Sequence, residues 1–313
     1  MSSLRCSSVA RREGLDPLGT AGHYRGFLLV DWPLPWPADL AELPALRPLV
    51  DALVGTGIRL QGLVPESASR ERRAILYHRP PGPGFGGYAR VEQRVAEPAV
   101  VATAVDLVRA GAAAVAHRPS GPEPTTTGDL LVCTHGRRDT CCGAAGTTLA
   151  GQLAADPAVV AAGNALSRTS HTGGHRFAPT GIVLPEGTMW ASLDRDLVHR
   201  IVARQGPLDT LLAHYRGCTG VGSPAVQAVE RAAFAEVGWD WLGWRRWADE
   251  LGGGRIRLVG DAPDGTRRAW TALVAERERP VPVCGRPLDE AVSHQREPVV
   301  VSIEATVPPA VTP

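Results

Sequence analysis

The stretch Asp129-Leu-Leu-Val-Cys-Thr-His-Gly-Arg-Arg-Asp-Thr-Cys-Cys-Gly143 decides how this chain is expected to fold. Its apolar start predicts a strand over residues 129–133 that ends on a thiol, and a polar loop follows. The next segments predict a helix at 147–155, strands at 165–169, 180–184 and 189–193, and helices at 196–203 and 208–215. This order of elements is the thioredoxin-like arrangement.

The same order occurs once before in the chain. Hydrophobic period and chain breakers predict strands at 26–30, 58–63, 74–78 and 88–95, and helices at 43–54 and 99–110. The Pro/Gly/Thr-rich segment 118–128 is typical of a linker. We therefore predict an α/β protein with tandem thioredoxin-like units in βαβββα order, an N-terminal unit at 1–117 without ligands and a second unit at 129–222.

Residues 223–313 differ in pattern and predict a small α+β appendage of unknown role. A helix is expected at 225–237, a tryptophan-rich helix or turn at 239–247, and strands at 256–259 and 268–275. The Asp264-Gly265 pair between those strands is a hairpin signal. Residues 307–313 are expected to form a frayed tail.

Composition narrows the function classes. The chain has 313 residues, 44% hydrophobic and 21% charged, with a net charge of +1 and 5% aromatic residues. Without a basic excess or many stacking aromatics, nucleic acid is not an expected partner. No stretch approaches the roughly 20 apolar residues that span a bilayer, and no secretory signal is seen, so we expect no membrane association and a cytoplasmic location.

Two segments carry the residue types that bind metals. Cys133 and Cys142 lie in the opening stretch, and His171 and His175 lie in Ser170-His-Thr-Gly-Gly-His-Arg-Phe-Ala178. Two thiolates and two imidazoles suit either a structural zinc or a [2Fe–2S] cluster with mixed ligands. A zinc finger would place about twelve residues between the second Cys and the first His, whereas 28 intervene here. From spacing alone, zinc, iron–sulfur and packing without metal all stay open.

At these residues the chain resembles the sucrase/ferredoxin-like family, over about residues 20–220. The matching positions are Cys133, His135-Gly136, Arg138-Asp139, Cys142-Gly143 and Ser170 through Ala178. The resemblance implies a thioredoxin-like ferredoxin whose [2Fe–2S] cluster is held by Cys133, Cys142, His171 and His175. It implies an electron carrier that exchanges electrons with donor and acceptor proteins of unknown identity. Zinc in the same ligands, in a structural or interaction module, is the alternative.

The neighbours of these ligands are expected to have supporting roles. Cys141 competes with Cys142 as a ligand, although only Cys142 precedes the glycine of the family pattern. His135 and Asp139 are expected to hold the loop. Cys6, Cys218 and Cys284 are isolated in the sequence and are expected to be single structural or surface thiols. We find no pair of carboxylates suited to sugar hydrolysis, so a hydrolase is not expected.

Overall fold

The structure is a computed structural model that describes residues 5–66, 69–81, 84–111, 113, 128–154, 156–286, 288–291 and 293–306, the side chain of residue 160 excepted. The predicted linker, apart from Gly128, and the predicted tail lie outside the described residues. None of the helices in the described part is long and apolar enough to cross a membrane.

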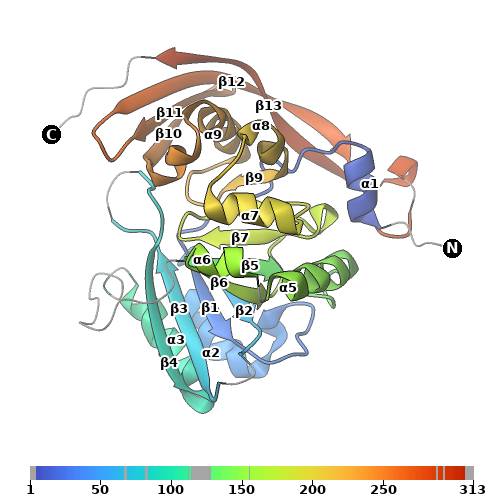
Figure 1. The fold of residues 1–313 in the computed structure, drawn as a ribbon, viewed down its shortest axis with the longest axis vertical. Helices are drawn as coiled ribbons and strands as arrows, with labels where there is room; N and C mark the ends of the chain where they lie inside the picture. Colours follow the sequence, from blue (N-terminus) through green and yellow to red (C-terminus); the bar gives the residue numbers. More distant parts are fainter. Residues whose placement is uncertain are drawn as a thin grey trace.

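One mixed sheet of nine strands forms the body of the molecule, in the order β4-β3-β1-β2-β6-β5-β7-β8-β9 (Figure 1). The strands are β1 (Gly26–Asp31), β2 (Ile58–Leu63), β3 (Glu71–His78), β4 (Ala89–Ala96), β5 (Gly128–Cys133), β6 (Asn164–Thr169), β7 (Gly181–Leu184), β8 (Thr188–Trp190) and β9 (Tyr215–Cys218). In both halves a parallel pair, β1 with β2 and β5 with β6, is extended by antiparallel strands, β3 and β4 in the first half and β7, β8 and β9 in the second. The predicted α/β class is thus confirmed, and the same strand order occurs twice.

The two halves of the sheet join next to the segment that contains the predicted histidine ligands. Strands β2 and β6 pair antiparallel through Leu63 and Thr169, the last residue of each strand. The chain segment that follows β6 therefore begins at the seam, where the two halves meet. That segment contains both predicted histidine ligands.

Strand β1 shows why a continuous apolar run is needed here. All six of its residues are buried. Leu28 and Val30 pack with residues of α2 (Arg47–Leu53) and α3 (Val100–Ala110), while Phe27 and Leu29 belong to the larger core. A strand covered on both faces lacks the polar alternation of a half-exposed one.

The helices follow the predictions with local differences. In the second half they are α5 (Thr147–Leu153), α6 (Pro157–Ala161), α7 (Arg195–Ala203) and α8 (Leu208–Leu211). The helix predicted at 43–54 begins only at Arg47, after short 3₁₀ turns at Leu40–Glu42 and Pro44–Leu46. Leu43 is extended, because proline at position 44 disfavours the helical conformation of the residue before it. The helix predicted at 208–215 ends early, and Tyr215 begins β9.

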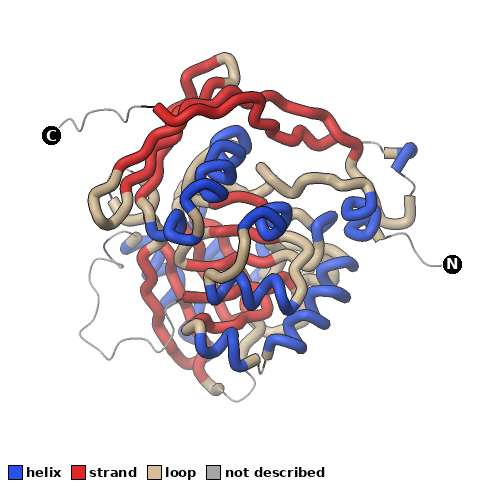
Figure 2. The backbone as a smooth tube through the Cα atoms, turned by 45° about the horizontal axis from the view of Figure 1, so that its top comes forward, coloured by secondary structure: helices blue, strands red, loops and turns tan. Residues whose placement is uncertain are grey.

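The C-terminal part forms a separate antiparallel sheet, as the appendage prediction implies. Strands β10 (Arg245–Gly252), β11 (Arg255–Asp261), β12 (Arg267–Pro280) and β13 (His294–Thr306) pair in chain order and arch over helix α9 (Pro224–Val237), as Figure 2 shows. The tryptophan-rich segment is a 3₁₀ turn, Trp239–Gly243, that leads into β10 rather than one helix. The predicted hairpin between β11 and β12 is present.

The N-terminal segment contacts the second half and the C-terminal sheet. Helix α1 (Cys6–Arg12) lies against the 3₁₀ turn His175–Phe177 of the second half, beside the loop that joins β12 and β13 (Figure 1). Further along, the N–H of Asp16 donates to Glu297 of β13 at 3.0 Å. Residues 5–16, which we assigned to the N-terminal unit, thus contact the second half and β13.

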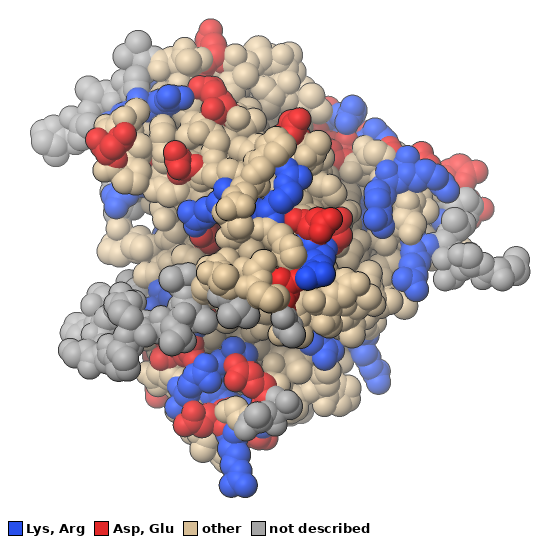
Figure 3. Space-filling view, viewed as in Figure 1, with Lys and Arg blue, Asp and Glu red and all other residues tan. Residues whose placement is uncertain are grey.

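Charged side chains of both signs occur on the face of the molecule shown in Figure 3. Acidic and basic residues alternate on the face shown in Figure 3, without a large region of one sign. This distribution matches the net charge of +1.

A buried ion pair fastens α9 to the sheet and to β10. The Glu230 carboxylate accepts hydrogen bonds from Tyr215 at 2.8 Å, Trp241 at 2.9 Å and Arg246 at 3.0 Å, and the side chains of Glu230 and Arg246 are fully buried. Burial raises the pKa of Glu230, and Arg246 opposes that rise. The arginine thus compensates a carboxylate that no solvent reaches.

We predict that Arg246→Met lowers the free energy of unfolding by about 3–5 kcal/mol, because it leaves the Glu230 carboxylate buried without its counter-charge. Arg296→Met is the control, since Arg296 and Glu276 form a pair at 3.5 Å with both side chains more than half exposed. Such a pair contributes at most about 1 kcal/mol. Urea unfolding measures both variants, and equal losses would contradict the assigned role of Arg246.

Candidate metal centre

The two predicted cysteine ligands meet where strand β5 ends. Cys133 is the last residue of β5, and Cys142 begins a π-helical turn, η4 (Cys142–Gly146), that leads into α5. A Cβ on Gly146 would lie 1.9 Å from the Cys133 carbonyl oxygen, and one on Gly143 would lie 2.4 Å from Gly136 Cα. Only glycine permits this close approach of the turn to the strand end.

Asp139 holds the loop in place, as expected. Its Oδ1 accepts hydrogen bonds from the backbone N–H groups of Cys141 at 2.8 Å and Cys142 at 3.3 Å. Its Oδ2 lies 3.5 Å from His175 Nδ1. One carboxylate therefore orders the cysteine turn and orients a histidine of the second segment.

Cys133 and Cys142 are buried and pack in one cluster. A hydrogen bond with Cys142 and, after the opposing effect of burial, one with His171 lower the pKa of Cys133 well below its ordinary value. The hydrogen bond with Cys133 and burial raise the pKa of Cys142. The Cys142 Sγ also lies 3.8 Å from the Thr180 hydroxyl. The pair thus favours a thiolate at Cys133, the form in which cysteine binds metals.

The backbone of His171 is fixed, while part of its ring has no partner. The His171 N–H donates to His135 Nδ1 at 3.2 Å, and its carbonyl accepts from Arg59 at 2.7 Å. Its ring Nδ1 is buried and has no hydrogen-bond partner among the described residues. A buried imidazole nitrogen without a partner is costly unless a ligand uses it.

His135 is engaged differently, in agreement with its expected structural role. Its Nε2 lies 2.7 Å from the Pro37 carbonyl, and its Nδ1 accepts the His171 N–H. Both ring nitrogens are occupied, so His135 ties the cysteine loop to the histidine loop.

The glycines between the two histidines make room for a buried arginine. Gly173 and Gly174 have φ angles of +80° and +66°, and a Cβ on Gly174 would lie 2.6 Å from the Arg216 guanidinium carbon. Arg216 is 1% exposed and donates to the carbonyls of Gly173 at 3.1 Å and Thr20 at 2.6 Å. Burial and the nearby Arg59 lower its pKa to about 10, and the Cys142 and Cys133 sulfurs act in the opposite direction.

Sequence reasoning missed Arg216. It lies in the short strand β9, in which all residues are buried. The only feature of the sequence that could have pointed to it is a single arginine within this short buried segment. It places a positive charge within electrostatic range of both predicted thiolates.

The fourth predicted ligand, His175, lies at the edge of this network. It belongs to the 3₁₀ turn His175–Phe177, and its side chain is 45% exposed. Burial, followed by the charges of Arg176 and Arg138, lowers its pKa and favours the neutral imidazole that coordinates metals. With Nδ1 facing Asp139, its Nε2 is the nitrogen that could bind.

The four predicted ligands do not converge on a single point. Within the described part of the chain, no three of them bring their ligand atoms within 4.8 Å of one another. Such spacing does not suit one tetrahedral ion, whose thiolate sulfurs lie about 3.8 Å apart when each Zn–S bond is about 2.3 Å.

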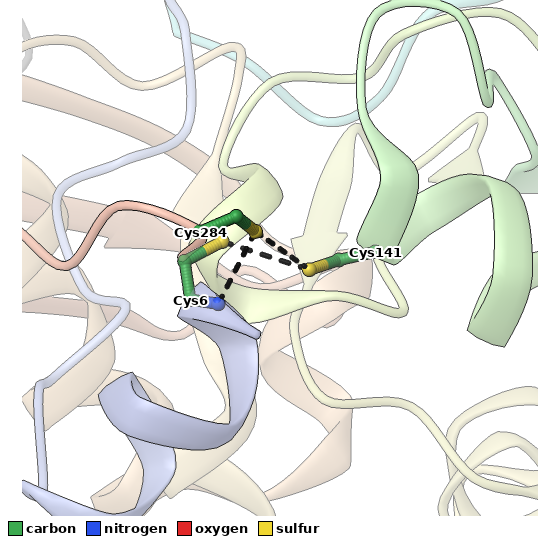
Figure 4. A group of neighbouring side chains, drawn as sticks. All are labelled: Cys6, Cys141 and Cys284. Atoms are coloured by element: carbon green, nitrogen blue, oxygen red, sulfur yellow. Dashed lines mark hydrogen bonds between the residues drawn. The ribbon is translucent and has the colours of Figure 1, made fainter. Parts of the chain in front are cut away.

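Cys141 has a different neighbourhood from Cys142. Its Sγ lies 3.6 Å from that of Cys6 and 3.5 Å from that of Cys284, and the three side chains point toward one another in Figure 4. The expectation that Cys6 and Cys284 are isolated thiols is therefore wrong, because folding brings the two ends of the chain to this loop. Cys218 remains apart from these groups, with its thiol 3.4 Å from the Glu186 carbonyl.

The ligand loops lie within a region that matches a known protein family. The family model described as sucrase/ferredoxin-like matches residues 17–217, more than half of the chain. The chain belongs to the sucrase/ferredoxin-like family. The matched region contains all four predicted ligands and Cys141, but neither Cys6 nor Cys284. Comparisons with curated proteins and with solved structures gave no match.

We predict that Gly174→Ala lowers the free energy of unfolding by about 1–3 kcal/mol, because alanine is strained at this positive φ and its Cβ collides with Arg216. Gly151→Ala is the control, since Gly151 lies in α5 with no atom near its added Cβ, and alanine is the better helix former. Urea unfolding measures both, and an unaltered Gly174→Ala variant would contradict the described loop.

Proposed function

We propose that Cys133, Cys142, His171 and His175 hold a [2Fe–2S] cluster and that the protein transfers electrons. The observation that carries the proposal is the packed, buried pair of Cys133 and Cys142 together with His171, whose buried Nδ1 has no hydrogen-bond partner among the described residues. This donor set, two thiolates and two imidazoles, is the set known for iron–sulfur clusters in which histidines replace two cysteines.

Two further observations favour a cluster over a single zinc ion at these residues. The ligand atoms are spread more widely than one tetrahedral ion requires. Membership in a family whose name includes ferredoxin also agrees with an iron–sulfur protein. A two-iron cluster distributes its ligands over two metal atoms, so a wider arrangement suits it.

When bound, the cluster would supply one-electron chemistry, and the chain's own residues would set its charge balance. Arg216 is a buried cation close to both thiolates, so it stabilises added negative charge and favours the reduced form. Asp139 orients His175 through Nδ1, as carboxylates commonly do for ligating histidines. The Thr180 hydroxyl can donate to the Cys142 sulfur.

A surface pocket reaches the histidine side of the site. It has a volume of about 320 Å³, and its lining includes His171, His135, Arg59, Arg138 and Asp39. His171 can therefore exchange a proton with solvent at the pocket. Among these lining residues, two arginines and one aspartate give a net positive charge. Such a charge suits a redox partner with an acidic contact surface.

Iron and acid-labile sulfide analysis after anaerobic purification tests the proposal. We expect iron and sulfide in equal amounts and an electron paramagnetic resonance signal that appears on reduction with dithionite. His171→Cys and His175→Cys should each retain a cluster with an altered spectrum. The exposed His294, replaced by Gln, serves as the control. An unaltered spectrum in both ligand variants, or zinc bound to these residues without iron, would refute the assignment.

We also predict that the reduction potential falls as the pH rises. Reduction adds negative charge, so the ligand imidazoles bind protons more tightly in the reduced form, and raising the pH removes that stabilisation. The reduction potential changes by at most about 59 mV per pH unit, the value reached when one proton accompanies one electron. Voltammetry between about pH 6 and about pH 10 measures it. The slope should diminish in His171→Cys or His175→Cys and persist in His294→Gln.

A further inference from the structure

We propose that Cys6, Cys141 and Cys284 form a second metal site that binds one Zn²⁺ ion and is separate from the Cys133/Cys142 site. The three sulfurs come from α1, from the loop before η4 and from the β12–β13 connection, and all lie within 4.8 Å of one another (Figure 4). Among the described residues, this is the only group of three or more Cys, His or acidic side chains whose ligand atoms converge so closely.

The distances suit a single ion. The sulfurs of Cys6 and Cys284 lie 3.6 Å and 3.5 Å from that of Cys141. Three thiolates bound to one tetrahedral Zn²⁺ have sulfurs about 3.8 Å apart, since each Zn–S bond is about 2.3 Å. A disulfide would need about 2.05 Å, and a third thiol would then have no role. Soft thiolate ligands select zinc over hard cations.

The surroundings supply the charge and hydrogen bonds that three thiolates require. Three thiolates and Zn²⁺ together carry one negative charge. The Arg176 guanidinium interacts electrostatically with Cys6, and its buried Nε and Nη1 have no partner among the described residues. The backbone N–H of Cys6 donates to the Cys284 sulfur at 3.3 Å. Ser7 forms hydrogen bonds with the Cys141 sulfur.

Three protein ligands leave one tetrahedral position for water or another exchangeable ligand. Cys6 and Cys141 are buried, whereas Cys284 is exposed, so that position can open toward solvent on the Cys284 side. The ion would fasten α1 and the β12–β13 connection to the loop that carries Cys142. Cys141 and Cys142 are adjacent but serve different groups of side chains.

Metal analysis of the full-length protein, purified anaerobically under reducing conditions, tests this site. We expect one zinc per chain in the wild type, and a zinc affinity more than about tenfold weaker in Cys6→Ser and Cys284→Ser, each of which removes a thiolate ligand. Cys218→Ser is the matched control, because Cys218 is a buried thiol outside both groups. Co²⁺ in place of zinc should give the visible absorption of a tetrahedral thiolate site, weakened in both variants. Circular dichroism checks that each variant is folded.

Cys284→Ser separates this site from the proposed cluster. Cys284 lies in an exposed connection, so its replacement should lower zinc and leave the iron content unchanged, whereas Cys133→Ser should lower iron and leave zinc unchanged. Three results would overturn the second site: reduced wild-type protein that binds no added Zn²⁺, zinc retained in full by Cys284→Ser, or zinc lost only in Cys133→Ser. Failure to find iron would count against the cluster alone.

Discussion

The close contact between the π turn and the end of β5 is the constraint on which the site depends. Gly146 meets the Cys133 carbonyl and Gly143 meets Gly136 at distances that leave no room for a Cβ. This contact seats Cys142 beside Cys133 and lets Asp139 accept both N–H groups at the start of the turn. Since one carboxylate oxygen is used there, the other can face His175. The cysteine loop and the histidine loop are thus both held by Asp139 beside this turn.

The duplicated topology shows what distinguishes the two halves. Strands β1 and β5 have the same length and the same pairing, so Asp31, the last residue of β1, occupies the place of Cys133. Asp31 forms a buried ion pair with Arg73 at 3.0 Å, with both side chains less than a tenth exposed. In the first half, the charged residue at the end of the strand is therefore paired with a residue of the same half. The second half places there Cys133, a predicted metal ligand, so the two similar halves differ in the chemistry of the residue at this strand end.

Local sequence patterns predicted the elements whose residues face one core, and they failed where distant contacts decide. The α/β order, the helix at α3 and the β11–β12 hairpin follow from period and turn residues in the sequence alone. By contrast, β9, β10 and β13 were not predicted, because strand pairing across the chain determines them. Cys6 and Cys284 are separated by 277 residues of sequence, and no local spacing could bring them to Cys141. Arg216 escaped notice because burial, not sequence context, gives its charge importance.

The ligand loops are braced by segments outside the family match. Helix α1 packs on the turn that carries His175, and Asp16 joins α9 and β13 through Arg231 at 2.9 Å and Glu297 at 3.0 Å. The region common to the family therefore supplies the four predicted ligands, while both ends of the chain restrain the loops that hold them. Under the proposed electron-transfer function, such bracing would lower the structural rearrangement that accompanies each change of charge. Helix α1 and the β12–β13 connection thus contact the loops that carry the predicted ligands.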